Sequence, residues 1–221
     1  VSANTTAGFS IVSYTGTGSN ATVGHGLGAV PKMYIVKDRD ASSSWNSYHV
    51  GLSDNNKVIK LNTSDAETQS SSWNNTAPTS SVFSLGTSGT VNGSGNDLIA
   101  YCFAEKKGYS KISSYVGNGS SDGTFVYTGF KPAFVIIKRS SDTENWNMYD
   151  SARNTYNPLG VELYPNLSNA ESSTIDRDFL SNGFKLRSTN AGRNASGSTY
   201  IYMAFAENPL VGTNNIPATA R

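Results

Sequence analysis

The segment Pro31-Lys32-Met33-Tyr34-Ile35-Val36-Lys37 indicates how this chain folds, because it returns as Pro132-Ala133-Phe134-Val135-Ile136-Ile137-Lys138, 101 residues further along the chain. Each copy carries four consecutive apolar residues shortly after a proline, which is typical of a buried strand. Other landmarks repeat in the same order: Gly8-Phe9-Ser10 as Gly108-Tyr109-Ser110, Trp45-Asn46-Ser47-Tyr48 as Trp146-Asn147-Met148-Tyr149, and Phe103-Ala104-Glu105 as Phe205-Ala206-Glu207. The common order predicts an internal duplication.

The length of the repeat predicts how the chain is organised. An offset of about 100 residues is too long for a solenoid repeat and close to the size of a whole domain. We therefore expect two tandem, similar modules, in residues 1–106 and 107–208, followed by a C-terminal extension or linker in residues 209–221. The alternative is one larger sandwich in which each copy supplies one sheet or one half.

The composition favours strands and turns. Charged residues make up 15% of the 221 residues and the formal net charge is +1, so the chain lacks the basic surface that attracts nucleic acids or anionic membranes. No apolar run is long enough to span a membrane. Ser, Thr, Asn and Gly supply most polar positions, and no stretch has the 3.6-residue period of a long amphipathic helix. These features predict an all-β protein without a nucleic-acid partner or membrane insertion.

Six strands are expected in each copy. In the first they lie at residues 9–14, 33–37, 45–49, 58–61, 82–85 and 98–103. In the second they lie at residues 110–115, 133–138, 146–149, 161–163, 183–186 and 200–205. Turns rich in glycine and asparagine separate them, such as Asn92-Gly93-Ser94-Gly95. Short strands with regular turn signals predict antiparallel β-sandwiches of the jelly-roll or lectin-like kind.

Two strands of each copy are apolar without alternation, namely residues 33–36 and 134–137 and the closing strands that end at Phe103 and Phe205. Such runs are typical of strands covered on both faces. We expect the outer face to be covered by the other copy, by a neighbouring subunit or by a long loop. An outer face lined by Tyr34, Tyr101 or Tyr202 and exposed to water is the alternative. Cover by a neighbour would make the chain part of an assembly.

The repeated Trp-Asn-x-Tyr is the best candidate for ligand recognition. Its residues are Trp45, Asn46 and Tyr48 in the first copy and Trp146, Asn147 and Tyr149 in the second. On a strand, the tryptophan and the tyrosine point to opposite faces because their separation is odd. One ring then fills the core while the other is offered outward beside an amide, an arrangement that suits a neutral sugar. The alternative is that both rings belong to a core or an interface.

Trp73 is a second candidate for sugar recognition. It lies in the polar stretch Ser72-Trp73-Asn74-Asn75-Thr76 and has no clear counterpart in the second copy. A tryptophan inside a polar loop is expected to be exposed, so Trp73 completes the predicted ligand-binding set.

Catalytic residues are not expected. Cys102 is the single cysteine and lies in an apolar run, so we expect it to be buried and to form no intrachain disulfide. His25 lies in a glycine-rich turn, Val23-Gly24-His25-Gly26-Leu27-Gly28. The aspartates of Asp38-Arg39-Asp40 and Asp176-Arg177-Asp178 are expected to be solvated loop residues paired with the intervening arginine. The sequence therefore predicts no catalytic residue, no metal site, no cofactor and no enzyme.

Several motifs together resemble an uncharacterised tandem repeat domain of virion and tail-associated proteins of tailed phages, notably of the marine and cyanophage type. They are Gly-Phe-Ser-Ile-Val-Ser-Tyr-Thr-Gly from Gly8, Val-Gly-His-Gly-Leu-Gly from Val23, Pro31-Lys32-Met33, Ala-Tyr-Cys-Phe-Ala-Glu from Ala100, and Tyr-Thr-Gly-Phe-Lys-Pro from Tyr127. The resemblance runs from about Gly8 to Glu207 and carries no established site residue.

This resemblance implies a bacteriophage virion protein, made in the host cytoplasm and carried on an extracellular particle. We expect a tail fibre, appendage or surface module that contacts copies of itself and other virion proteins and recognises a host surface polysaccharide. A purely structural capsid-decoration or fibre subunit without a ligand is the alternative. A glycan depolymerase is the least favoured.

Overall fold

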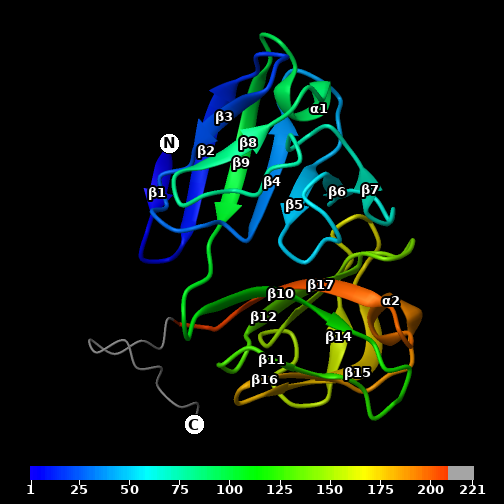
Figure 1. Ribbon diagram of the computed structural model, residues 1–221. Helices are drawn as coiled ribbons and strands as arrows, with labels where there is room; N and C mark the ends of the chain where they lie inside the picture. The colour runs from blue at the N-terminus through cyan, green and yellow to red at the C-terminus, as the bar shows by residue number, and fades with distance from the viewer. Residues whose placement is uncertain (209–221) are drawn as a thin grey trace. The chain divides into compact units, whose positions relative to one another are not determined.

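The computed structural model describes residues 1–208, except for the side chains of residues 174 and 175. The chain divides into two compact units, Val1–Glu105 and a second unit that begins at Lys106. The expected C-terminal extension, residues 209–221, lies outside the described residues. Figure 1 shows both units and labels most of their elements.

The first unit contains two antiparallel sheets. One has the order β1-β2-β9-β4-β5-β6-β7 and the other pairs β3 with β8. The elements are β1 (Ser2–Asn4), β2 (Phe9–Thr15), β3 (Ala21–Gly24), β4 (Met33–Asp38), β5 (Asn46–His49), β6 (Lys57–Lys60), β7 (Thr68–Gln69), β8 (Val82–Leu85), the single-turn helix α1 (Gly89–Asn92) and β9 (Asp97–Phe103).

The described residues of the second unit, 106–208, also form two antiparallel sheets, with the orders β10-β17-β12-β13 and β11-β16-β15-β14. Its elements are β10 (Ser110–Val116), β11 (Phe125–Tyr127), β12 (Phe134–Arg139), β13 (Asn147–Asp150), β14 (Leu159–Glu162), β15 (Ser172–Leu180), β16 (Gly183–Leu186), the single-turn helix α2 (Ala191–Asn194) and β17 (Thr199–Phe205).

The predicted all-β, antiparallel class is confirmed, and each expected strand has a counterpart within two residues of its predicted ends. Five strands were not expected: β1, β3, β7, β11 and β15. The first four have two to four residues, too few for a periodic signal. β15 carries Asp176, Arg177 and Asp178 in its centre, a composition that is depleted in strands.

The two units have backbone hydrogen bonds at corresponding positions after their first long strands, β2 and β10. Gly16 donates to the carbonyl of Asn96 at 2.9 Å, and Gly117 donates to that of Ser198 at 2.9 Å. Gly18 donates to the carbonyl of Asn92 at 2.8 Å and Gly119 to that of Asn194 at 2.8 Å. Gly18 and Gly119 have φ values of 71° and 68°, a left-handed conformation that favours glycine.

Each unit has its own core between its two sheets. In the first, Val12, Tyr34 and Ala100 of the large sheet pack with Phe83 and Leu85 of β8. In the second, the same arrangement is made by Tyr115, Val135, Tyr202, Phe184 and Leu186. A core formed by side chains from two facing sheets defines a β-sandwich.

The apolar strands are buried on both faces, as predicted. Tyr34 and Val36 belong to the core of the first unit, while Met33 and Ile35, on the other face of β4, are only 1% and 8% exposed. The second unit repeats this, because Ile136 and Ile201 lie opposite the core-facing residues of β12 and β17 and are also buried. The expectation that these runs are buried on both faces is therefore confirmed for β4, β12 and β17.

The alternative, a water-exposed outer face lined by tyrosines, does not describe most of these residues. Tyr34 and Tyr202 point into the cores and are buried, so the alternative applies to neither. Tyr101 lies between the core residues Ala100 and Cys102, so it points to the outer face, where it is half-buried. No helix among residues 1–208 has the length and apolarity needed to cross a membrane.

Candidate functional site

The Trp-Asn-x-Tyr of the first unit places its rings on opposite faces, as predicted. Tyr48, on β5, lies in the core and stacks on Tyr34 with ring centres 4.8 Å apart. Trp45 immediately precedes β5 and stacks on Tyr101 with ring centres 6.2 Å apart. Asn46 is buried on the core side beside Tyr48. Trp45 is therefore the one partly accessible member of this motif.

The Trp-Asn-x-Tyr of the second unit offers no ring to solvent. Trp146, Asn147 and Tyr149 are between 1% and 2% exposed. The expectation of an outward aromatic is therefore wrong here, because large aromatic side chains gain most from burial. The alternative, that both rings are structural, describes this copy.

Trp73 is fully buried, so the expectation of an exposed anchor is wrong. Its ring packs edge-on against Tyr34, with centres 4.9 Å apart. Its Nε1–H donates to the carbonyl of Lys57 at 3.0 Å. The indole thus removes a large apolar area from water while its single donor keeps a partner, and the polar neighbours in the sequence do not determine its position.

Trp73 has a counterpart in the second unit, and it is an arginine. Gly86 donates to the carbonyl of Ser72 at 2.7 Å, and Arg187 donates to that of Asp176 at 2.6 Å. These bonds place Asp176 where the first unit has Ser72, and Arg177 where it has Trp73. The guanidinium of Arg177 lies 3.4 Å from the centre of the Tyr149 ring, a cation–π contact inside the sandwich.

A buried ionic cluster surrounds Arg177. We use this name for Glu162, Asp176, Arg177 and Arg193, all at most 3% exposed. Arg193 donates to Glu162 at 2.8 Å and pairs with Asp176, and Arg177 pairs with Asp176 and lies 3.7 Å from Glu162. Two cations and two anions balance, which offsets the desolvation of the charges.

Residues of the Trp-Asn-x-Tyr motif complete this cluster. The Nη1 of Arg193 donates to Oδ1 of Asn147 at 3.0 Å, and the Tyr149 hydroxyl donates to Glu162 at 3.2 Å. Burial raises the pKa of Asp176, and the two adjacent arginines only partly offset this rise. Asp176 and Asp178 were expected in a solvated loop; they are instead buried on β15, so that expectation is wrong. The enclosed, balanced arrangement is suited to holding the fold.

The nucleophile and base candidates are enclosed. Burial raises the pKa of the Cys102 thiol to about 12, with a smaller opposing effect of the Ser10 hydroxyl, and Cys102 is fully buried, as predicted. His25 is buried with both ring nitrogens in contact, Nε2 with the carbonyl of Thr79 at 3.1 Å and Nδ1 with the amide of Leu27 at 3.2 Å. Burial lowers the pKa of His25, and the bond to Thr79 partly opposes this. These bonds require a neutral imidazole.

The expectation of a solvated pair holds for Asp40, which is exposed after the end of β4, and is wrong for Asp38. Asp38 is 1% exposed and accepts hydrogen bonds from the amides of Asp40 and Ala41 and from Asn96. Burial raises the pKa of Asp38, but these bonds outweigh it, so its pKa is lowered. Asp38 thus fixes the turn after β4. Among residues 1–208, no group of three or more His, Cys, Asp or Glu is placed to hold a metal ion.

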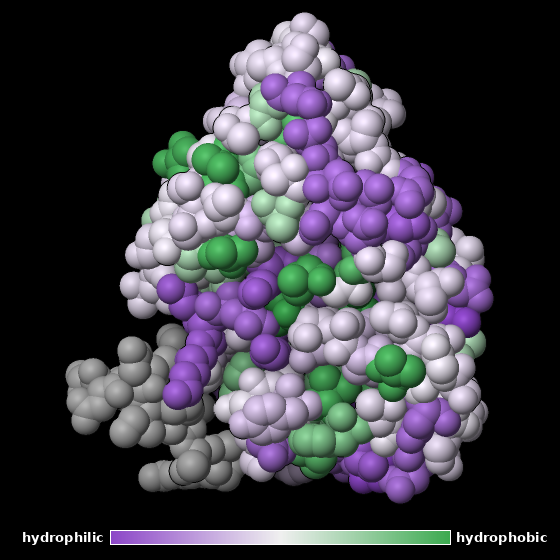
Figure 2. Space-filling view, viewed as in Figure 1, coloured by the Kyte–Doolittle hydropathy of each residue, from purple (hydrophilic) through white to green (hydrophobic). Residues whose placement is uncertain are grey.

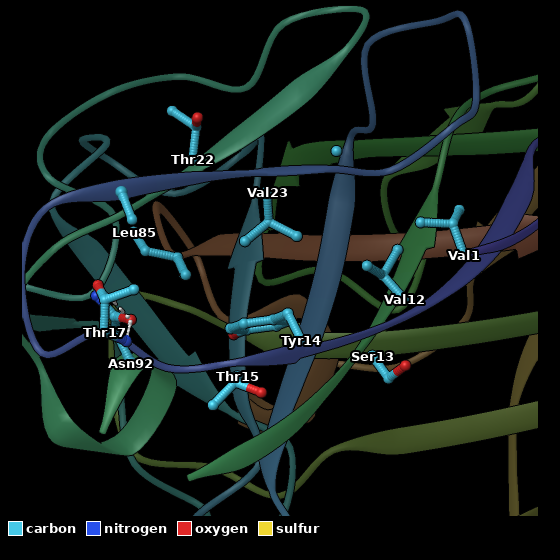
Figure 3. A pocket seen from close by; sticks show the side chains of 12 residues that line it. Val1, Val12, Ser13, Tyr14, Thr15, Thr17, Thr22, Val23, Leu85 and Asn92 are labelled. Atoms are coloured by element: carbon cyan, nitrogen blue, oxygen red, sulfur yellow. Dashed lines mark hydrogen bonds between the residues drawn. The ribbon is translucent and has the colours of Figure 1, made fainter. Parts of the chain in front are cut away.

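A groove of about 390 Å³ opens in the first unit between β2 and β3. Figure 3 shows the side chains around it, with Val12, Tyr14, Val23 and Leu85 among those that line it. Tyr14 donates its hydroxyl to the carbonyl of Val91 at 2.7 Å. The volume falls in the range of ligand-binding clefts, and the walls are mixed apolar and hydroxyl-bearing. Sequence reasoning did not find this groove, because it is formed where two strand edges face each other.

Two exposed aromatic residues lie on one face of β11. Phe125 is 43% and Tyr127 64% exposed, while Val126 between them is 5% exposed and belongs to the core. The alternation Phe-Val-Tyr is the signal that could have identified them. On the face of the molecule that Figure 2 shows, apolar residues form small patches separated by polar surface.

Comparison with known proteins gives a family. A model described as "Domain of unknown function (DUF7483)" matches residues 1–209. The chain belongs to this family. The DUF7483 match takes in both compact units. No curated protein matches the chain. One similar solved structure is described as "Crystal Structure of the STIV MCP", with 8% identity, coverage of 89% of this chain and 95% of that chain, and a TM-score of 0.25.

Proposed function

We propose that this DUF7483 protein is a structural component of a tailed-phage virion, made in the host cytoplasm and assembled with copies of itself and with other virion proteins. The sequence motifs that resemble phage virion proteins support this proposal. A nearly neutral chain of β-sandwich units without disulfides also suits a particle that is assembled in a reducing compartment. More specifically, we propose a tail fibre, an appendage or a surface module.

The burial of the reactive side chains supports a structural rather than a catalytic role. Cys102 and His25 lie inside the first unit, and the charged groups of the ionic cluster lie inside the second. Each is held by neighbours in its own unit, and general acid–base catalysis needs a group that can reach a substrate proton. We therefore propose that Cys102, His25 and the ionic cluster stabilise the two sandwiches.

Immunogold labelling of purified particles of the phage that encodes this chain tests the proposal. We expect an antibody against the folded chain to label intact particles, and the chain to co-purify with them at a fixed ratio to the other virion proteins. Presence in infected cells combined with absence from purified particles would overturn the proposal. The position of the gold on the tail or head distinguishes a fibre from a surface module.

Host-glycan recognition is the second candidate, and the accessible aromatics favour it. The side chains of Phe125 and Tyr127 extend from the same face of β11, so their rings form a short platform of the kind that suits the apolar face of a sugar. Trp45, stacked on Tyr101, is the accessible aromatic of the predicted set. A glycan array on the intact chain tests this. Binding that Phe125→Ala and Tyr127→Ala abolish and Tyr156→Ala preserves would support recognition, and no binding to host polysaccharides would leave the purely structural role.

We also propose that the two units descend from one duplicated module. The corresponding hydrogen bonds of Gly16 and Gly117, and of Gly18 and Gly119, support this. So do Tyr14 and Tyr115, which donate to the carbonyls of Val91 and Arg193, in α1 and α2. Separate expression tests whether each unit is a module of its own. We then expect each unit to fold alone and to unfold in its own cooperative transition.

A further inference from the structure

The accessible rings of β11 lie beside charged side chains on the same face of their sheet. In the register of β11 and β16, Phe125 is opposite Lys185 and Tyr127 is opposite Gly183, and residues directly opposite each other share one face of a sheet. Arg187 follows β16 directly and is two residues beyond Lys185, so the alternation of side chains places it on this face too. Gly183 and Arg187 are four residues apart, so this surface is roughly 14 Å long.

Glycine backbone lies against both rings. A Cβ atom at Gly183 would lie 3.0 Å from Cζ of Phe125, and one at Gly129 would lie 3.6 Å from the hydroxyl oxygen of Tyr127. The absence of a side chain at these two positions thus lets the rings pack closely on the chain. Because these contacts restrict the rings before a ligand arrives, less side-chain freedom is lost on binding.

Three ion pairs join the charged part of this surface. Nζ of Lys185 lies 2.9 Å from Oδ1 of Asp122, and Nη1 of Arg187 lies 3.6 Å from the same oxygen. Nε of Arg187 donates to Oδ2 of Asp178 at 2.6 Å. Two cations and two carboxylates balance, so this part of the surface offers no net charge to an ionic ligand. It suits a neutral ligand with many polar groups.

Polar atoms of this network remain open to solvent. The side chain of Asp122 is 81% exposed and that of Arg187 is 42% exposed. Among the described residues, no hydrogen bond reaches Oδ2 of Asp122 or Nη2 of Arg187. The hydrogen bond from Lys185 lowers the pKa of Asp122, so its carboxylate is ionised at neutral pH. An open acceptor next to an open donor suits two neighbouring hydroxyl groups, since each hydroxyl both donates and accepts.

The first unit, which is also a β-sandwich, lacks these side chains. Its corresponding strands are β3 and β8, because Val23 pairs with Phe83 as Val126 pairs with Phe184. The matched positions hold small residues, namely Thr22 for Phe125, Gly24 for Tyr127, Ser84 for Lys185 and Gly86 for Arg187. A sandwich of this kind therefore forms without the rings and the charges, and binding of a ligand gives a reason for their presence in the second unit.

We propose that this surface binds a short neutral glycan, with the apolar face of one pyranose ring on Phe125 and Tyr127 and two neighbouring hydroxyl groups on Asp122 and Arg187. The C–H face of a pyranose packs on aromatic rings, and the hydroxyls around it need donors and acceptors. An acidic sugar would bring its carboxylate close to Asp122, and this like charge disfavours it. The inference rests on the glycan-recognition candidate above and adds to it the polar half of the site and the class of sugar.

Titration of the full chain with trisaccharides, followed by NMR, tests the class of ligand. The neutral probes are maltotriose, cellotriose, mannotriose and galactotriose, and the acidic probe is trigalacturonate. We expect at least one neutral probe to shift the amide resonances of Phe125, Tyr127 and Lys185 and to leave those of Thr22 and Ser84 unchanged. Trigalacturonate is expected to bind at least about tenfold more weakly than that probe. Tighter binding of trigalacturonate than of every neutral probe would overturn the proposal.

Variants at exposed positions separate this inference from glycan recognition itself. Asp122→Ala removes the open carboxylate and is expected to weaken binding of the neutral probe at least about tenfold. Glu171→Ala is the matched control, because Glu171 is an exposed carboxylate that pairs with Arg153, and it is expected to leave binding unchanged. Binding lost with Phe125→Thr, which introduces the residue of the first unit, but unaffected by Asp122→Ala would keep glycan recognition and overturn the proposed polar contacts. Binding of no probe would overturn both, while particle labelling tests the virion role separately.

Discussion

The guanidinium of Arg177 lies 3.4 Å from the centre of the Tyr149 ring inside the second unit. The corresponding place in the first unit holds Trp73, which packs on Tyr34. The first unit therefore has an apolar side chain at the position where the second has a charged one. The buried charge of Arg177 is compensated by Glu162 and Asp176 within the same core.

Removing one charge from the ionic cluster should destabilise the second unit strongly. Glu162→Gln leaves Arg193 and Arg177 short of a carboxylate, and breaking a buried pair costs about 3 to 5 kcal/mol. The double variant Glu162→Val with Arg193→Val removes one charge of each sign, so we expect it to cost less than the two single changes together. Urea denaturation of the wild type, Glu162→Gln, Glu162→Val, Arg193→Val and the double variant measures these costs, and simple additivity of the two valine changes would contradict the coupling.

The first unit should lose stability in mild acid through His25. Because burial lowers the pKa of His25 below its ordinary 6.5, the unfolded chain binds the proton more readily. The His25 contribution is therefore complete above about pH 6.5 and declines as the pH falls further. Denaturation of the wild type and His25→Gln from about pH 7 to about pH 5 should show a steeper decline in the wild type. Parallel curves would exclude His25 as the source.

Trp73 should behave as a core residue. Trp73→Ala removes a fully buried indole and its bond to Lys57, and such truncations cost about 3 to 5 kcal/mol. Trp45→Ala, at a partly exposed position, is the matched comparison and should cost less. Thermal unfolding followed by near-ultraviolet circular dichroism measures both, and equal losses would disagree with the different burial of the two rings.

Asn92 should be essential to the loop after β2. Its buried amide nitrogen donates to the carbonyls of Ser19 and Gly86 at 2.7 and 2.8 Å, and its Oδ1 accepts from Thr17 at 2.8 Å. Asn92→Ala leaves these groups without partners, at an expected cost of about 2 to 4 kcal/mol. Asn4→Ala, at the exposed end of β1, is the control. Hydrogen exchange at Thr17 should rise in the first variant only.

Cys102 should be inert in the folded chain. Its thiol is fully buried and its pKa is about 12, so little reactive thiolate is present at neutral pH. A colorimetric disulfide reagent is expected to titrate one thiol in denaturant and almost none under native conditions. Rapid native labelling would show that β9 opens frequently.

The strands that the sequence predicts are those with their own local signal. β4 and β12 can be predicted from sequence, because a short, continuous apolar run after a proline is typical of a strand covered on both faces. β15 could not be found in this way, since the charges of Asp176 and Arg177 are balanced inside the core only when Glu162 of β14 and Arg193 of α2 lie beside them. Local pattern predicts a strand well when burial depends on the strand itself, and poorly when it depends on distant charges.

The candidate site illustrates the same limit. The polar neighbours of Trp73 suggested a solvated loop, while the contacts that bury it come from Lys57 and Tyr34. Its counterpart Arg177 was hidden because the offset between the copies changes from 101 residues at Pro31 and Pro132 to 104 at Ser72 and Asp176. The groove had no sequence signal at all, because it forms where the edges of β2 and β3 face each other, and β2 and β3 belong to different sheets.

The ionic cluster also limits which segments of the second unit could be grafted into the first. A chimera that carried Arg177 into the first unit without Glu162 of β14 and Arg193 of α2 would enclose an unbalanced cation in an apolar core. β14, β15 and α2 would therefore have to be moved together, because the charges of this core balance only when all three are present.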